Sequence, residues 1–197
     1  MVWDEVFDAA PAGRDELIEL VGTHLRLTGA ISLGRFGRLS DLINASSGYL
    51  RIHDARLLLR NGEPTSLVLP ELLVDQDEIS FIAQDQAVPP EPGSGIGFIE
   101  PTFGSEIEAR KEREFVIFTP AHTVTGKVHV FGQTDLAGFV DSTDPRFVPI
   151  TSATTRSLAD RRIVGHYAFL LINRTQMIAA SEIGRQGDIA PEDVPDL

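Results

Sequence analysis

The side chains that could act as acids, bases or metal ligands near neutral pH are five histidines and a few short acidic clusters. A metal site needs three or four converging ligands, and no HxH or HExxH spacing occurs. His24 and His122 each precede a Thr-Gly pair by a few residues. We therefore expect them to be equivalent strand positions facing one groove, although a lone strand histidine is more often structural.

The segment RLSDLIN, residues 38–44, contains the most compact group of polar and apolar side chains. Its residue types predict a structural corner: Ser40 or Asp41 caps a short helix, the apolar residues face the core, and Asn44 ends the helix. A ligand-binding role for Asp41 and Asn44 is the alternative interpretation.

Two further patterns resemble ligand sites but lack essential parts. The glycines of PGSGIGF, residues 92–98, precede no Lys-Ser/Thr pair and follow no strand, so we interpret them as linker. The acidic cluster of Asp75, Asp77 and Glu78 lacks the turn glycine and distant Glu of an EF-hand loop, which favours a charged hairpin turn. No GxSxG segment or paired carboxylates stand out, so we predict no catalytic residue, metal or cofactor.

The sequence has 42% hydrophobic residues and a formal charge of -12. This composition predicts a soluble globular protein. That charge disfavours nucleic acid, and the densest basic stretch, EARKERE at 108–114, mixes acids with its bases as a solvated helix or linker does. There is no cysteine. We see no secretory signal or membrane-length apolar run, so we expect a cytoplasmic location and no membrane partner.

The sequence contains an internal tandem repeat. LTGAISL, which contains Thr28-Gly29, and VTGKVHV, which contains Thr125-Gly126, alternate apolar and polar residues in the same phase. At the same offset Asn44 falls on Asp141, and after a one-residue slip the later apolar residues align as well. Residues 16–29 alone would pass for a helix, but their partner segment contains β-branched residues and Pro120, so we predict both to be extended.

The repeat predicts a mainly β protein made of two homologous small SH3-like or Sm-like barrel units, each with one short helix. In the first copy we expect one long strand at 16–33, a helix or turn at 38–46, a strand at 49–59 and a strand pair within 66–83. The predicted boundaries, in chain order, are repeat 15–84, linker 85–113, repeat 114–183 and acidic tail 184–197.

RLSDLIN, YLRIHDA and LLVDQDEISFIA in the first copy, with FVPITSA and LLINRTQMIAA in the second, resemble an uncharacterised bacterial domain family. That family carries an R-L-x-D-x-L-N segment, a "pltdA"-like strand and a closing "vnrdqI" strand. The resemblance implies the fold and no activity. A looser similarity to Sm-like proteins implies RNA-binding rings, but VDQDEIS and INRTQMI stand where those proteins have an Arg-Gly pair.

We therefore expect a non-enzymatic protein–protein interaction or scaffolding module that uses sheet edges or the groove between the copies. Its partner is another protein or a second copy. The alternative is a small-ligand or nucleotide sensor that binds in the cleft between the copies, and an enzyme comes third. The candidate cleft residues are His24, Asp41, Asn44, His122 and Asp141.

Overall fold

The computed structural model describes residues 14–59, 63–84, 111–130, 135–142, 144–160 and 164–183. Across them the chain is mainly β and forms a single antiparallel sheet of ten strands with two short α-helices. No helix in these ranges is long and apolar enough to cross a membrane. The glycine-rich segment 92–98, most of the predicted linker and the acidic tail lie outside the described residues.

The first half of the sheet consists of five strands, one α-helix and one 3₁₀ turn. These are β1 (Asp15–Gly22), β2 (Arg26–Ser32), α1 (Leu39–Ala45), β3 (Tyr49–Leu58), β4 (Pro64–Asp75), η1 (Gln76–Glu78) and β5 (Ile79–Gln84).

The second half repeats this element order. Its elements are β6 (Lys111–Phe118), β7 (His122–Val130), α2 (Leu136–Asp141), β8 (Phe147–Ser157), β9 (Val164–Asn173), η2 (Arg174–Gln176) and β10 (Ala179–Glu182).

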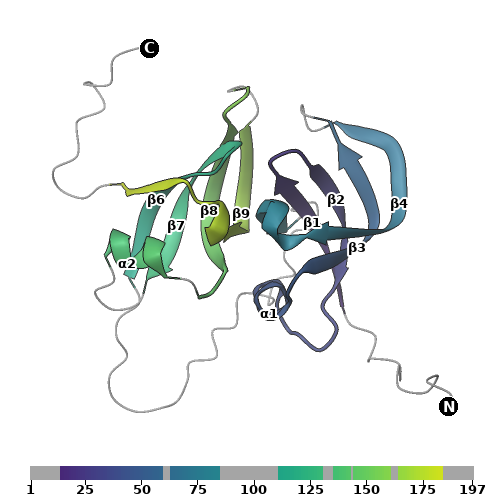
Figure 1. Ribbon diagram of the computed structural model, residues 1–197, viewed down its shortest axis with the longest axis horizontal. Coiled ribbons are helices and arrows are strands. Elements are labelled where there is room, and N and C mark those ends of the chain that lie inside the picture. The colour runs from purple at the N-terminus through teal and green to yellow at the C-terminus, as the bar shows by residue number, and fades with distance from the viewer. Residues whose placement is uncertain are drawn as a thin grey trace.

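The strand order is β10-β6-β7-β8-β9-β5-β1-β2-β3-β4, so each half places its fifth strand beside its first. The halves meet where β5 pairs with β9, and β10 and β4 form the two edges of the sheet. Figure 1 shows the strands of the two halves side by side, with β4 strongly bent at one end. The mainly β prediction is confirmed.

The two halves share unusual backbone features at matching places. Gly29 and Gly126 both lie so close to the next strand that an added Cβ would be 2.5 Å from an isoleucine Cγ2, of Ile52 or Ile150. The pairing register shifts beside each glycine, as at a β-bulge. The facing strands carry positive φ values of 50° at Asp54 and Ser152. Tyr49 corresponds to Phe147, which lies 98 residues later, and the same spacing of 98 residues holds throughout the last three strands of each half.

Several local predictions need correction. The expected single strand at 16–33 is the β1–β2 hairpin, because the chain turns at Gly22, where an added Cβ would lie 2.5 Å from the carbonyl oxygen of Glu78. Part of the charged segment 108–114 belongs to β6, which begins at Lys111. The first turn of α1 follows Arg38 and has no side-chain cap, so neither Ser40 nor Asp41 caps the helix. The predicted turns at 75–78 and 173–176 are confirmed as η1 and η2.

The buried side chains form two apolar cores, one in each half, and each core includes side chains from both halves. The core of the first half includes Phe147 and Leu171 from the second half, both fully buried. The core of the second half includes Val21, Phe81 and Ala83 from the first half. Because the cores are shared, the halves pack as one unit.

Candidate functional site

The β5–β9 junction is the pairing of Phe81, Ile82 and Ala83 with Ile172, Leu171 and Leu170. All six side chains are buried. Ile82 and Leu171 enter the core of the first half, whereas the others enter that of the second. A strand of one half thus completes the sheet of the other through backbone pairing and apolar side chains on both faces.

Two asparagines fix the junction near one end of β8. Asn44 of α1 donates from Nδ2 to the carbonyl oxygen of Phe147 at 3.0 Å and accepts from its backbone N–H at 2.8 Å. Asn173, fully buried at the end of β9, donates from Nδ2 to the carbonyl oxygens of Gln76 and Ile79 at 3.0 and 2.9 Å. Each amide satisfies backbone groups of the other half, which an apolar or charged side chain could not do.

An ion pair lies beside these asparagines. The guanidinium of Arg146 contacts the carboxylate of Asp77, and its Nη1 atom is 3.5 Å from the side-chain oxygen of Gln76. The Asp77 side chain is 76% exposed, so the pair contributes no more than about 1 kcal/mol and serves mainly to orient the two halves.

A second polar group lies on the junction around Tyr167. Its hydroxyl donates to Glu19 at 3.2 Å, and the other oxygen of Glu19 accepts from Arg26 at 2.6 Å. Burial, with the nearby charge of Glu19, raises the pKa of Tyr167 to about 12. The Phe81 ring packs edge-on against Tyr167 and His122, with centroids 6.0 and 5.5 Å away.

This group has the chemistry of a packed interface. Tyr167 is too weak an acid to donate its proton near neutral pH, and Arg26 neutralises Glu19. Burial, with Arg26 nearby, lowers the pKa of His122, and this favours the neutral imidazole. Among the described residues no three His, Asp or Glu side chains are placed to hold a metal ion.

Stability is expected to depend on pH through His122. Its pKa in the folded protein lies below the value of 6.5 that applies when unfolded, so the unfolded chain binds more protons below that pH. The free energy of unfolding should be unaffected by this residue above about pH 6.5 and decrease as the pH falls, by at most about 1.4 kcal/mol per unit. Urea unfolding of the protein and of His122→Leu between about pH 5 and 7 measures the difference; parallel curves would contradict the expectation.

The structure does not gather the five predicted cleft residues into one site. Asn44 contacts Phe147 at the start of β8, whereas His122 pairs with Ser157 at its end. His24 lies in the β1–β2 turn, on the rim of a groove that is lined mainly by residues of β4. Asp41 and Asp141 are exposed on separate helices.

One predicted equivalence is wrong by one residue. Leu25 and His122 occupy the same turn position, because their carbonyls accept from the N–H of Gly22 and Thr119 respectively, so His24 does not match His122. The helices begin at matching positions, since the N–H groups of Leu42 and Phe139 donate to the carbonyls of Arg38 and Asp135, and this alignment keeps Asn44 over Asp141. Because α1 is one residue longer, alignment of the helix ends at Ser46 and Ser142 instead matches Asn44 with Val140. Neither Asp141 nor Val140 is an amide. The polar contact of Asn44 across the junction therefore has no copy in α2.

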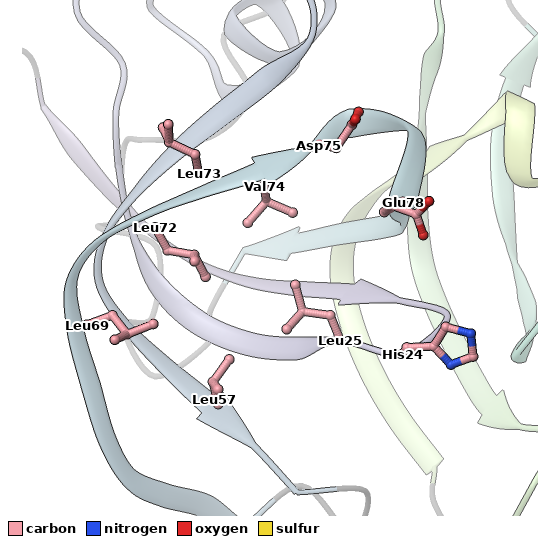
Figure 2. A pocket seen from close by; sticks show the side chains of 9 residues that line it. All are labelled: His24, Leu25, Leu57, Leu69, Leu72, Leu73, Val74, Asp75 and Glu78. Carbon is pink, nitrogen blue, oxygen red and sulfur yellow. The ribbon is translucent and has the colours of Figure 1, made fainter.

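An apolar groove opens beside β4 at the edge of the sheet (Figure 2). Its volume is about 360 Å³, at the small end of the range for ligand pockets. Figure 2 shows its apolar side chains converging from the β1–β2 turn, β3 and β4, with His24, Asp75 and Glu78 on the rim and Leu73 directed away. We call it the leucine groove; its floor consists of Leu25, Leu57, Leu69, Leu72 and Val74.

The chain matches no protein-family model, no curated protein and no solved structure.

One pattern in the sequence indicates the groove, although it contains no polar motif. The β4 segment SLVLPELLVD carries apolar residues on both faces, a pattern typical of strands buried inside a sheet. The structure nevertheless places β4 at an edge, with Leu67, Val68 and Leu73 between 44% and 53% exposed. Phe81 and Tyr167, which form the junction, carried no comparable signal, because each reads as an ordinary strand residue.

Proposed function

We propose that the protein is a non-enzymatic protein–protein interaction module made of two tandem small barrel-like units, and that its binding surface is the β4 edge. The observation that carries this proposal is the β5–β9 junction. There the chain itself shows how the fourth strand of one half accepts the fifth strand of the other.

The β4 edge carries the same features, and none of the strands in the described residues pairs with its outer side. Leu73 stands where β9 has Leu171, and Tyr49 stands where β8 has Phe147. Leu171 and Phe147 are fully buried in the core of the neighbouring half, whereas Leu73 and Tyr49 are 53% and 64% exposed. Exposed apolar side chains on an edge strand are typical of surfaces that bind another protein by strand addition.

The decisive test compares Leu73→Lys with Leu17→Lys. Both leucines lie on strands and are about half exposed, at 53% and 49%, but Leu17 belongs to the interior strand β1. The free energy of unfolding of both variants should lie within about 0.5 kcal/mol of that of the unmodified protein. The immobilised full chain is used to capture proteins from native lysate, and the captured proteins are identified by mass spectrometry.

We expect the captured set to be lost with Leu73→Lys and retained with Leu17→Lys. Identical captured sets for the two variants would show that the β4 edge is not the binding surface, and the proposal would then be wrong.

A further inference from the structure

Resting on the proposed function, we infer the kind of partner that the leucine groove accepts. The occupant is an extended strand of another protein, which inserts an aromatic side chain into the groove and carries Lys or Arg two or three residues before it. The inference comes from comparing the groove with the matching place in the second half, where the occupant is visible.

The groove and the site around Phe81 are the same place in the two halves. The pairing registers match the groove residues one by one to positions in the second half. Leu25, Leu57, Leu69, Leu72 and Val74 correspond, in this order, to His122, Thr155, Tyr167, Leu170 and Ile172. Phe81 fills that site: its ring contacts His122 and Tyr167, and it is 1% exposed.

The groove of the first half is more apolar than the filled site. Leucines stand where the second half has His122, Thr155 and Tyr167, so the groove lacks the polar side-chain atoms of that site. Leu170 is fully buried, whereas Leu72 is only partly buried. An aromatic ring is the side chain that buries the most apolar surface in such a space.

The junction also fixes the register of the occupant. Phe81 pairs with Ile172 and Ala83 with Leu170, in antiparallel orientation. By the same register the partner's aromatic residue lies opposite Val74, and a small residue lies opposite Leu72. Pro70 has no N–H to donate to a partner strand, but it lies before residues 72–74, so the backbone groups of these residues can still pair.

Charges at the rim select the residues that precede the aromatic. Asn173 donates to the carbonyl of Ile79, two residues before Phe81. The matching position in the first half is Asp75, whose carboxylate can only accept, and Glu78 lies on the same rim. A partner must therefore supply donors there, and a basic side chain does so while balancing both carboxylates.

A second copy of this chain fits the groove poorly. Its free strand β10 carries Ala179 at the position of Phe81, so the groove would remain unfilled. The amide–backbone contact of Asn44 would also be lost, since α2 has Val140 and Asp141 in that region and neither is an amide. These differences favour a different protein as the occupant.

The test uses the synthetic peptide KKSFIAQ, which keeps residues 80–84 of this chain and replaces Glu78 and Ile79 by lysine. Fluorescence anisotropy of the labelled peptide with the full chain measures Kd. We expect KKSAIAQ to bind at least about tenfold more weakly, because the buried ring is lost. We expect EESFIAQ to bind at least about threefold more weakly, with a difference that shrinks as salt is added.

Variants of the protein locate the peptide. Leu72→Lys should abolish binding of KKSFIAQ, and Leu17→Lys should leave its Kd unchanged. Ring-current shifts of the His24 imidazole protons in the NMR spectrum report an aromatic ring at the rim. A Leu72→Lys protein that still binds the peptide would place the site elsewhere and overturn the inference.

The remaining outcomes separate this inference from the proposed function. Equal binding of KKSFIAQ and KKSAIAQ, or no binding of either at millimolar concentration, overturns the aromatic occupant even if the Leu73→Lys capture result still supports the β4 edge. Equal binding of EESFIAQ overturns the basic requirement. Sedimentation that shows self-association of the full chain, abolished by Leu72→Lys, identifies a second copy as the occupant and also overturns the inference.

Discussion

Residues 1–90 expressed alone are expected to lack a cooperative unfolding transition or to self-associate. A unit of about 70 residues buries only about 60% of its unfolded surface and is marginally stable even with a complete core. This half does not have a complete core, because Phe147 and Leu171 of the second half fill part of it. Removing them leaves a cavity, and it also exposes Phe81 and Val21, which are 1% and 2% exposed in the whole chain.

The expected loss is large compared with the stability of a small domain. Each fully buried Leu, Val or Phe contributes about 1.5–3 kcal/mol, and four such side chains together approach the whole stability of about 5–15 kcal/mol. Urea unfolding followed by circular dichroism, with sedimentation of the same sample, gives the comparison with the full chain.

Co-expression of residues 1–90 with residues 111–183 is the matched control. The β5–β9 junction joins the halves through backbone pairing and side chains, so the two fragments should associate and recover a cooperative transition. If instead residues 1–90 are monomeric and melt within a few degrees of the full chain, the shared cores do not stabilise the halves.

The sequence predicted the types of secondary structure well, but it predicted their boundaries and the residue-by-residue match of the two halves less well. Strands and turns were found because the alternating β-branched segments and the polar turns at 75–78 and 173–176 are local signals. The hairpin in 16–33 was missed because the turn from Gly22 to Leu25 is short and lies between two segments with similar alternation of apolar and polar residues. His24 was matched with His122 because a one-residue shift leaves a short apolar pattern nearly unchanged.

The junction lay beyond sequence reasoning because its contacts join residues far apart in the chain. Asn44 and Phe147 are 103 residues apart, and nothing near Asn44 indicates a backbone partner in the other half. Asn173 and Asp75 illustrate the same limit. Each accepts a backbone N–H two residues later to start a 3₁₀ turn, so the local sequences look alike. Only the structure shows that Asn173 also donates across the junction.

Exchanging these two residue types is expected to have very unequal effects. Asn173→Asp keeps the size of the side chain and the oxygen that accepts from Thr175 at 3.1 Å, but it replaces the donating Nδ2 by a second oxygen. That oxygen would face the carbonyl oxygens of Gln76 and Ile79 in a fully buried place. Two buried acceptors lose their donor and a charge is buried, so we expect a loss of about 3 kcal/mol or more in the free energy of unfolding.

Asp75→Asn is the matched control. Asp75 accepts from Asp77 at 2.9 Å through an oxygen that an amide retains, and the residue lies at the open edge of the sheet. We expect a change within about 0.5 kcal/mol.

The effect of Asn173→Asp should also depend on pH in a defined direction. Burial raises the pKa of the introduced carboxyl in the folded protein above its unfolded value of about 3.9, so the folded state holds a proton that the unfolded state releases. The destabilisation is therefore smallest below about pH 4, where both states are protonated, and it grows as the pH rises toward the folded-state pKa. Urea unfolding of both variants between about pH 4 and 8 measures this. A loss for Asn173→Asp that is no larger than for Asp75→Asn at pH 7 would mean that the amide contacts do not hold the junction together.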